Sequence, residues 1–591
     1  MVREFFNKET SHRPSEEMYE ALLDIALTLE DMANEKAENK IHLSSLAPGI
    51  GKTQTIYFFL NLLLKEKQYE DKGILIGLSS YDEIESYIER LDIDRSNIAV
   101  LTSDSKINKL GNSDPLEAQV LFTTQQRMDV RLKQYDNFNA AQEFFYIDKA
   151  RPIRIWDESF LPGKTIVSNR DDLMFLIGAL RKTHPELTEE LDKLLNVRLR
   201  KAENGSVIEL PDLRNSYAIS LNELAGILNR LGKSTLEIER ASNFWFLLGR
   251  PVSVRNDGFM GNTVLRYEET MPDDITPLLV LDASGNCRTT YEEMAKHRRN
   301  IVRLKSASKD HSELEVHHWI AGGGKYSFRR HSDQYVEGIA NTVNCESSKE
   351  WLIIVHKDMG LEDRINSLLL KEVDKNKVHF ITWGNHRATN KFSHIDRVIL
   401  AGTLYLPDSL HESLGRLAAG KLPEHGEYSK ESISRVADGE LKNVILQGAC
   451  RGAVRLCDGD KCKPCKIFIM GAKRSVKPEL FQELFPKSSY QPWRPITREL
   501  TGKIKLAMDY LNKRFGEPNE SKASFVSFNE VMKASGYMSI ENGKEKYDRA
   551  NFNKNIRSHP EFQIVLAEAG LEETCREAKR NNGFARFSWT P

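Results

Sequence analysis

The sequence predicts an α/β protein with two tandem parallel-sheet domains, a helical insertion within the first and a small domain after the second. Three observations predict this organisation. A glycine-rich turn ending in Gly-Lys-Thr lies between an apolar strand and an apolar helix within residues 41–64. Short apolar runs then alternate with helical segments as far as residue 157, and a second alternation begins near residue 350. Such alternation is typical of parallel sheets covered by helices.

The bulk composition indicates a globular chain of several domains. Its 591 residues, 40 % of them hydrophobic, can supply cores for about three or four domains. Lys and Arg together number 84 and Asp and Glu 85, which gives a formal net charge of −1. No global field therefore attracts the chain to nucleic acid, and any basic groove must be local.

The location expected from the sequence is the cytoplasm, with no membrane partner. No apolar run reaches the length of a membrane span, and the first residues, MVREFFNKETSHRPSEE, are too polar for a signal peptide. Seven cysteines in so long a chain do not fit a secreted disulfide framework.

Residues 1–40 are expected to form a helical lead-in, because 15–38 carry apolar residues at helical spacing behind Ser15 as N-cap. The next stretch, IHLSSLAPGIGKTQTIYFFL, predicts a strand, a phosphate-binding loop (P-loop) and a helix.

Four residues of this loop carry its chemistry. Gly49 and Gly51 let the backbone turn its N–H groups toward a phosphate, and Lys52 is placed to reach the β- and γ-phosphates. The Thr53 hydroxyl is placed to ligate Mg²⁺ at the positive end of the helix. The loop therefore predicts a site for ATP and Mg²⁺.

An acidic pair, Asp157 and Glu158, stands at the end of the apolar strand expected at 154–157. Asp157 would hold Mg²⁺ through water, and Glu158 would orient and deprotonate the water that attacks the phosphate. Taken alone, an apolar strand followed by Asp-Glu is common. Because strand-like runs separate it from the Gly-Lys-Thr loop, the pair predicts the second half of a nucleotide site.

Residues 165–275 interrupt the alternation and are interpreted as an insertion in a first domain that spans 41–300. The helical stretches and a hairpin-like pair within it are expected at 171–180, 187–195, 220–231 and around 255–258. The core resumes with an apolar strand at 278–281, which ends in Asp-Ala-Ser-Gly and includes Ala283 and Ser284.

The second domain is expected at 301–475. Its elements begin with a strand, a helix and a strand at 351–355, 361–370 and 378–383. A polar loop containing Thr389 and Asn390 follows, and then a further apolar strand near 398–401.

Two arginines close the second domain's pattern. Arg451 and Arg455 follow Gln447 and stand one helical turn apart, so both guanidinium groups would reach one cleft. An apolar strand is expected at 444–446, directly before them.

In their order over roughly residues 40–475, these motifs resemble those of superfamily 2 helicases. The loop L-A-P-G-I-G-K-T is similar to their A-x-x-G-x-G-K-T form, with Leu46 where the strict P-loop pattern has glycine. The acidic pair looks like their Asp-Glu box. The arginine segment resembles motif VI, whose arginine stabilises the charge on the transferred phosphoryl group. Cys450 stands where that motif has glycine and the second arginine falls one residue late, which leaves open whether Arg451 or Arg455 acts.

The resemblance also assigns residues to nucleic acid and to coupling. Hydroxyl and amide side chains at strand ends suit contact with a strand's phosphates. The residues it assigns to that contact are Thr123, Thr124, Gln125, Thr389 and Asn390. Ala283 and Ser284 resemble the Ser-Ala-Thr element that links ATP hydrolysis to strand movement.

The resemblance implies ATP bound between two RecA-like domains. It further implies an ATP-dependent helicase or translocase acting on single-stranded or partly duplex DNA, with RNA not excluded. Two other functions remain open, a terminase-like packaging motor and a nucleotide-dependent regulatory switch. The arginine motif and the second alternation argue against the packaging motor, which follows one ATPase domain with a nuclease. For the insertion, gripping DNA and simple packing both remain open.

Four cysteines crowd into the end of the second domain. Close thiolates on a turn suit Zn²⁺ or an iron–sulfur cluster. The candidate ligands are Cys450, Cys457, Cys462 and Cys465. A hairpin loop of reduced cysteines is the alternative, because Cys450 lies inside the arginine motif and only one Cys-x-x-Cys step is present.

The segment 476–497 contains several prolines and is interpreted as a linker. Three helices and a terminal hairpin are expected in 498–591, which suggests a winged-helix-like domain. Lys554 and Arg557 would then face a phosphate backbone. A module that docks a protein partner has the same outline, so that alternative remains open.

Overall fold

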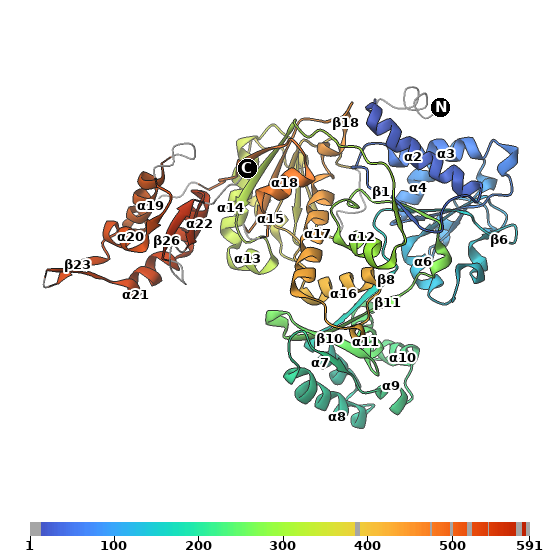
Figure 1. Cartoon of the computed structure of the whole chain (residues 1–591), viewed down its shortest axis with the longest axis horizontal. Helices are drawn as coiled ribbons and strands as arrows, with labels where there is room; N and C mark the ends of the chain where they lie inside the picture. The colour runs from blue at the N-terminus through green and yellow to red at the C-terminus, as the bar shows by residue number, and fades with distance from the viewer. Residues whose placement is uncertain are drawn as a thin grey trace.

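The computed structural model describes residues 13–384, 391–472, 475–496, 500–516, 523–541, 543–574 and 582–586. Two α/β domains form the body of the molecule, an inserted subdomain lies below them in Figure 1, and a C-terminal domain stands apart at the left. Each domain of the body is built on a parallel sheet. The predicted class, two tandem parallel-sheet α/β domains, is confirmed.

The first domain holds a seven-stranded sheet of order β13-β1-β12-β7-β2-β4-β3, in which every neighbouring pair is parallel. Its strands are β1 (Ile41–Ser44), β2 (Ile74–Leu78), β3 (Ile98–Leu101), β4 (Val120–Thr124), β7 (Ile153–Asp157), β12 (Leu278–Leu281) and β13 (Ile301–Arg303). Because β13 pairs with β1, this sheet continues to Arg303, slightly beyond the expected end at residue 300.

Helices cover both faces of this sheet. They are α2 (Glu16–Ala33), α3 (Lys52–Leu63), α4 (Tyr81–Arg90), α5 (Ser105–Asn108), α6 (Gln125–Leu132) and α12 (Thr289–Glu293). In α2 the Ser15 side chain accepts the Met18 N–H at 3.4 Å, so Ser15 is the N-cap that the sequence predicts. The buried stripe Met18, Leu22 and Ile25 packs this helix into the sheet's core.

The insertion, called the insert below, spans 163–269 and has its own core around Phe244 and Trp245. Its antiparallel sheet has the order β8-β11-β10-β9. The elements are β8 (Gly163–Ser168), α7 (Arg170–Leu180), α8 (Pro185–Lys193), β9 (Val207–Glu209), α9 (Leu213–Ser216), α10 (Leu221–Arg230), α11 (Thr235–Leu247), β10 (Pro251–Asn256) and β11 (Asn262–Glu269). Helices α7, α8 and α10 and the hairpin β10–β11 match the predicted segments.

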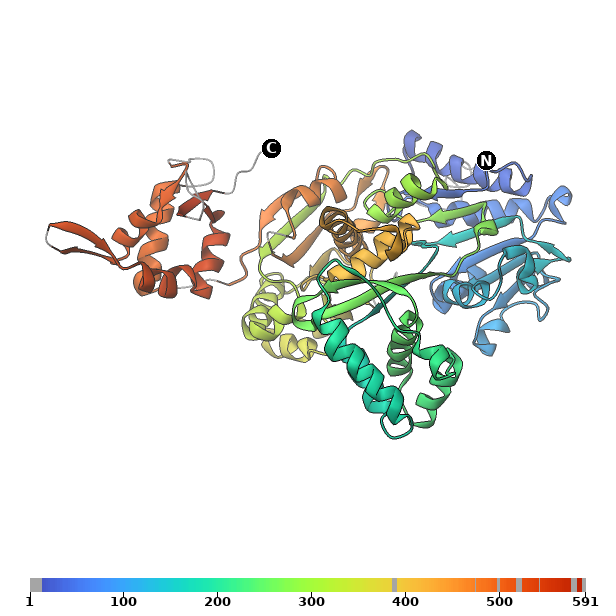
Figure 2. The same ribbon diagram turned by 60° about the horizontal axis from the view of Figure 1, so that its bottom comes forward.

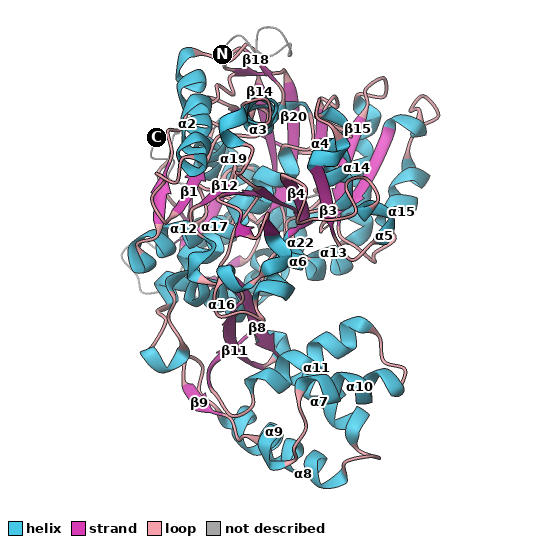
Figure 3. Cartoon of the chain, turned by 90° about the vertical axis from the view of Figure 1, so that its right-hand side faces the viewer, coloured by secondary structure: helices cyan, strands magenta, loops and turns pink. Residues whose placement is uncertain are grey.

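Although the insert belongs to the first domain in sequence, it packs on the second. Helix α16 (Asp408–Ala419) of the second domain lies along β8 and β11 (Figure 3). Its Glu412 side chain, which is fully buried, forms ion pairs with Arg255 of the insert and with Arg416. At the edge of this contact, Arg266 of the insert pairs with Glu424 at 2.8 Å. The insert is therefore anchored on the second domain by buried charges.

The second domain holds a six-stranded sheet of order β16-β15-β17-β20-β14-β21, again parallel throughout. Its strands are β14 (Leu314–Ile320), β15 (Trp351–Val355), β16 (Val378–Thr382), β17 (Arg397–Leu400), β20 (Cys465–Gly471) and β21 (Ser489–Pro492). Its other helices are α13 (Lys325–Arg330), α14 (Ser332–Cys345), α15 (Leu361–Leu368), α17 (Lys430–Ala449) and α18 (Pro478–Leu484).

The interpretation of 476–497 as a linker was wrong. Helix α18 and strand β21 lie in this segment, and β21 pairs with β14 as the edge of the second sheet. Phe481 and Trp493 are buried in the domain's core. Two of these prolines occupy positions where a missing amide proton costs nothing, because Pro478 opens a helix and Pro492 ends an edge strand.

The strand expected at 444–446 was also wrong. These residues lie in α17, a twenty-residue helix that ends just before the arginines. Val444, Ile445 and Leu446 are all buried, because neighbours cover several sides of this helix. A short, uninterrupted apolar run looks the same in a buried helix as in a buried strand.

The C-terminal domain, which stands apart from the rest of the molecule in Figure 2, has its own core around Met508, Leu511, Phe552 and Phe584. Its elements are α19 (Gly502–Phe515), β22 (Val526–Ser527), α20 (Phe528–Ala534), β23 (Met538–Glu541), β24 (Lys544–Tyr547), α21 (Arg549–Phe552), α22 (Pro560–Glu568), β25 (Leu571–Thr574) and β26 (Gly583–Arg586). An antiparallel sheet β22-β26-β25 and a projecting hairpin β23–β24 accompany the helices. The winged-helix assignment stays a prediction.

Within the described ranges, no helix combines the length and the apolar character that crossing a membrane requires.

Candidate functional site

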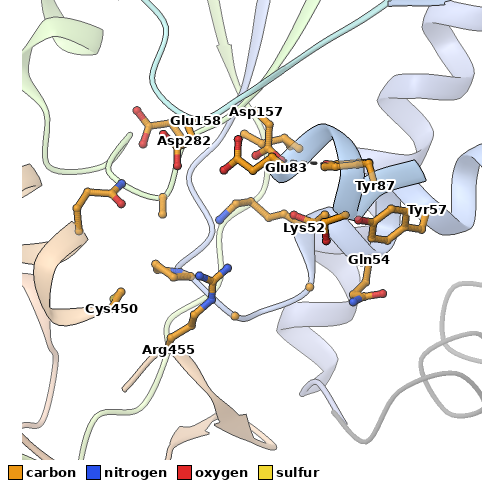
Figure 4. Close-up of a pocket in the computed structure, with 18 of the residues that line it drawn as sticks. Lys52, Gln54, Tyr57, Glu83, Tyr87, Asp157, Glu158, Asp282, Cys450 and Arg455 are labelled. Carbon is orange, nitrogen blue, oxygen red and sulfur yellow. Dashed lines mark hydrogen bonds between the residues drawn. The ribbon is translucent and has the colours of Figure 1, made fainter. Parts of the chain in front are cut away.

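A cavity of about 580 Å³ lies between the two parallel-sheet domains. In Figure 4, Lys52, Asp157 and Glu158 from the first domain face Cys450 and Arg455 from the second. Eleven of the residues singled out from the sequence line it: Gly49, Gly51, Lys52, Thr53, Asp157, Glu158, Ala283, Gln447, Cys450, Arg451 and Arg455. Residues far apart in the chain thus meet in one place, as the motifs predict.

The glycine-rich loop joins β1 to α3 and needs both of its glycines. Gly49 has φ +85° and Gly51 has φ +120°, conformations that strain any residue with a Cβ atom. A Cβ at Gly49 would also lie only 1.8 Å from the carbonyl oxygen of Arg455. The loop of the first domain is therefore in direct contact with the arginine segment of the second.

Lys52 is the first residue of α3, and its side chain folds back over the loop. Its Nζ donates to the carbonyl oxygen of Leu46 and lies 3.5 Å from that of Ala47. Burial lowers the pKa of Lys52 to about 8, while Asp157 and Asp282 oppose this shift. A triphosphate in the loop would offer this ammonium stronger acceptors than two backbone carbonyls.

The acidic pair stands at the carboxyl end of β7. The Tyr87 hydroxyl donates to Asp157 Oδ2 at 2.9 Å. Burial raises the pKa of Asp157 to about 6 and that of Glu158 to about 8, and the Glu83 carboxylate adds to both shifts. Glu158 also has φ +92°, a strained backbone of the kind that gathers at functional sites. The cavity thus holds carboxyl groups that a cation would stabilise in charged form.

The donor set fits Mg²⁺ bound together with a nucleotide. Within the described residues, no three His, Cys, Asp or Glu side chains are grouped to hold a metal alone. Magnesium at such sites takes only one or two protein ligands and completes its shell with waters and substrate phosphates. Thr53 and Asp157 line the cavity beside the loop and are the residues that would hold it.

The two arginines reach the cavity by a route that differs from the prediction. Helix α17 ends at Ala449, and Arg455 closes a short 3-10 turn, so the two arginines do not share a helical face. Arg451 Nη2 donates to Gln447 Oε1 at 3.0 Å. Burial lowers the pKa of Arg451, and the Glu158 carboxylate opposes that shift.

Lys309, in the segment that connects the two domains, ties the loop to the arginine segment. Its Nζ donates to the carbonyl oxygens of Val454 at 2.6 Å, Arg455 at 2.9 Å and Pro48 at 3.3 Å. The side chain is buried. No motif in the sequence marks this lysine, because its role depends on where the connecting segment passes.

Other residues of the site were also missed. Glu83 and Tyr87 come from α4, whose sequence carries no motif. Asp282 directly follows the apolar strand β12, as an acidic residue also ends β7, so the sequence did carry a signal for it. Asp282 Oδ1 accepts the Ser284 hydroxyl at 2.6 Å, and Ser284 is fully buried. Of the two predicted coupling residues, Ala283 lines the cavity and Ser284 orients Asp282.

The nucleic-acid contacts predicted at the end of β4 are not supported. Thr123 is fully buried and donates to the Leu101 carbonyl oxygen at 2.7 Å. Thr124 caps α6, and Gln125 Nε2 donates to the Asp157 carbonyl oxygen. The three side chains form contacts within the first domain, because β3 lies beside β4 and the end of β7 lies within reach of Gln125. Thr389 and Asn390 lie outside the described residues.

Arg557 takes part in contacts within the C-terminal domain, and its contact with nucleic acid stays a prediction. It forms a paired contact with the Glu573 carboxylate, at 3.1 Å from Nε and 2.5 Å from Nη2, and its guanidinium lies 4.2 Å from the centre of the Phe528 ring. These contacts hold the C-terminal domain together. Lys554 is exposed, and its contact with nucleic acid stays a prediction.

The cysteine metal site is not supported. As stated above, the described residues contain no group of three metal-ligating side chains. Cys450 is buried beside the cavity, whereas Cys457 and Cys462 lie on the short hairpin β18 (Cys457–Asp458) and β19 (Lys461–Cys462). A hairpin that carries reduced cysteines is the alternative to a metal site that the sequence left open.

No protein-family model matches the chain, and no curated protein matches it. Among solved structures, it is similar to XPD in a structure titled as the apo form, with 15 % identity over 79 % of this chain and 99 % of that chain and a TM-score of 0.48. It is also similar to S. tokodaii Xpd4, with 14 % identity over 80 % and 99 % and a TM-score of 0.43. S. cerevisiae Dbp5 bound to RNA and ADP BeF3 has 10 % identity over 81 % and 93 %, with a TM-score of 0.33. At similarities this low, what those proteins bind does not transfer to this chain.

Proposed function

We propose that this protein is an ATP-driven helicase or translocase that moves along nucleic acid, with single-stranded DNA as its track. The observation that carries the proposal is the composition of the cavity. Lys52 and the acidic pair come from one parallel-sheet domain, and Arg451 and Arg455 come from the other. A triphosphate held by the loop would therefore draw on both domains at once, which makes hydrolysis sensitive to their relative position.

Each charged group has a role that its surroundings suit. Lys52 binds the β- and γ-phosphates, and Thr53 and Asp157 hold Mg²⁺, which neutralises charge on the phosphates. Glu158 accepts a proton from the attacking water. Its pKa of about 8 lies close to neutral pH, and a general base is most effective when its pKa is near the pH at which the enzyme works. One of Arg451 and Arg455 stabilises the charge that develops on the γ-phosphoryl group, and the other helps to bind the nucleotide.

Conversion of hydrolysis into movement needs a link between the domains. Two buried contacts supply candidates for it, the Lys309 contacts described above and an ion pair between Arg288 and Glu440. If the two states of the cleft hold a nucleic-acid strand differently, alternation between them moves the strand.

The decisive experiment measures the ATPase rate of the full chain alone and with single-stranded DNA, duplex DNA and RNA. Strong stimulation by single-stranded DNA, lost in Lys52→Ala and Glu158→Gln, is the expected result. Stimulation by RNA and not by DNA would show that RNA is the strand along which the protein moves. An ATPase rate that no nucleic acid changes would contradict the proposed motor function and would favour the nucleotide-dependent regulatory switch.

The same assay decides between the two arginines. Removal of the arginine that touches the transferred phosphoryl group should lower kcat by roughly a thousandfold. Removal of the other should act mainly on KM for ATP. Comparison of Arg451→Ala with Arg455→Ala, in kcat and KM separately, assigns the roles.

A further inference from the structure

Cys457 and Cys462 face each other on the hairpin β18–β19. They are register partners in this antiparallel pair. Because Lys463 N donates to the Leu456 carbonyl oxygen at 3.2 Å, the neighbouring pair is hydrogen-bonded and the cysteine pair is not. Residues at such positions have Cα atoms about 4.5 Å apart with their side chains close together. A disulfide spans Cα distances of about 4.4–6.8 Å, so this pair can be bridged with little backbone movement.

A third thiol and an ammonium group surround the pair. Cys465 lies in the same core cluster as Cys462, and its thiol lowers the pKa of Cys462. Burial raises the pKa of the Cys457 thiol, and the nearby Lys309 ammonium opposes that shift and also favours the thiolate of Cys462. All of these thiols are free. Cys457 is partly exposed, whereas Cys462 is buried, so an oxidant from solvent meets Cys457 first.

The hairpin is joined to the cavity through one backbone oxygen. Cys457 Sγ lies 4.0 Å from the carbonyl oxygen of Arg455. That oxygen accepts the Lys309 ammonium and packs against Gly49. A change in the position of Cys457 is therefore transmitted over two residues to the contact between the P-loop and the arginine segment.

We propose that Cys457 and Cys462 form a reversible disulfide and that this modification slows ATP hydrolysis. The oxidant is a low-molecular-weight disulfide. The Cys457 thiolate attacks one sulfur of that disulfide and releases the other as a thiolate, and the Cys462 thiolate then attacks Cys457 Sγ and releases the second. Two protein thiols are oxidised to one S–S bond, the small disulfide is reduced to two thiols, and the two protons pass to the released thiolates.

The test treats the reduced full chain with oxidised glutathione and maps its disulfides by peptide mass spectrometry. A Cys457–Cys462 bridge is expected, together with a fall in ATPase rate of roughly tenfold or more, because small displacements at a reacting centre are costly. Dithiothreitol should restore the rate. A protein that is fully oxidised elsewhere but carries no such bridge would overturn the proposal, as would a bridged protein with an unchanged rate.

Serine variants supply the controls. Cys457→Ser and Cys462→Ser should keep the basal rate and lose the response to oxidised glutathione. Cys345→Ser, which removes an exposed thiol at the end of α14, should keep the response. The effect on rate rests on the proposed ATPase. If the reduced protein hydrolyses no ATP, that function fails, while the peptide map and nucleotide binding still decide whether the disulfide forms and acts.

Discussion

Arg288 Nε donates to Glu440 Oε1 at 2.8 Å, and both side chains are buried at the boundary between the two sheet domains. Arg288 follows β12 in the first domain, whereas Glu440 belongs to α17, the helix that ends beside Arg451. Arg288 Nη1 also lies 3.9 Å from Asp282 Oδ2. Burial favours the neutral arginine, but Glu440 and Asp282 outweigh it and raise the pKa of Arg288. Arg288 thus connects Asp282, which lines the cavity in the first domain, to Glu440 of the second domain.

Removal of Glu440 should destabilise the protein. In Glu440→Ala the Arg288 charge stays buried with only a distant partner, which costs about 3 kcal/mol of unfolding free energy. Denaturant unfolding followed by tryptophan fluorescence measures this. Glu431→Ala, at the exposed first turn of the same helix, is the matched control and should change stability by less than about 0.5 kcal/mol. Equal effects of the two substitutions would contradict an energetic role for the pair.

A side chain at Gly49 should separate the two halves of the site. The methyl group of Gly49→Ala would overlap the Arg455 carbonyl oxygen and would strain a backbone with φ +85°. We expect the ATPase rate to fall by roughly a hundredfold, while the variant still folds. Gly178→Ala is the control, since it lies in α7 with no atom within 4 Å of the added methyl group. An active Gly49→Ala enzyme would show that hydrolysis does not need this approach.

Loss of the Tyr87 hydroxyl should weaken the binding of Mg²⁺ that supports ATP hydrolysis. In Tyr87→Phe the Asp157 carboxylate loses the hydrogen bond that helps to keep it charged, so its pKa rises above about 6. The half-saturating Mg²⁺ concentration for ATP hydrolysis should rise by about tenfold, the worth of one hydrogen bond to a charged group. The rise should be larger at pH 6 than at pH 8, where Asp157 is ionised in both proteins.

Tyr146→Phe gives the matched loss of a hydroxyl far from the cavity, because Tyr146 donates to the Glu70 carbonyl oxygen. Its Mg²⁺ dependence should equal that of the wild type. If Tyr87→Phe behaves in the same way, Tyr87 does not act through Asp157.

The second domain should lose stability in mild acid through His318. Its Nε2 donates to the Gly471 carbonyl oxygen at 2.9 Å, which leaves Nδ1 to accept the Tyr490 hydroxyl at 3.1 Å in a neutral ring. Burial lowers the pKa of His318 from 6.5 to about 4. Between these values the unfolded chain binds a proton that the folded chain does not, so the free energy of unfolding falls as pH falls.

The size of this effect follows from the width of the window. Between pH 6.5 and pH 5, His318 should lower the free energy of unfolding by about 2 kcal/mol, at about 1.4 kcal/mol per pH unit. Denaturant unfolding at pH 7.5 and pH 5 measures it. His318→Gln, which cannot take up the proton, should show a pH dependence smaller by that amount. An identical pH dependence in the two proteins would assign the acid sensitivity to other groups.

Local patterns predicted the parts of the site whose geometry is local. Gly49, Lys52 and Asp157 were found because a strand end, a turn and a helix start fix their positions within a few residues. Thr123 was misassigned because the direction of its hydroxyl depends on β3, a neighbour in space. Glu83 and Lys309 left no signal in the sequence, since their roles arise only when α4 and the connecting segment pack against the cavity.

The errors in the fold have a related cause. Residues 444–446 are apolar because α17 is buried on several sides, and a sequence does not state how many sides of an element are covered. The prolines of 476–497 occupy positions at which helices and edge strands accept proline, so they marked element ends and not a linker.

The insert is connected to the two parallel-sheet domains in different ways. The chain enters and leaves the insert through β8 and β11, which come from the first domain, while Arg255 and Arg266 fasten it to the second. Any rotation of one parallel sheet against the other must therefore be taken up where those two strands leave the first domain. Because β8 and β11 pack along α16, the insert would then move together with the second domain, and the bend would fall in the segments 158–162 and 270–277 that join it to the first.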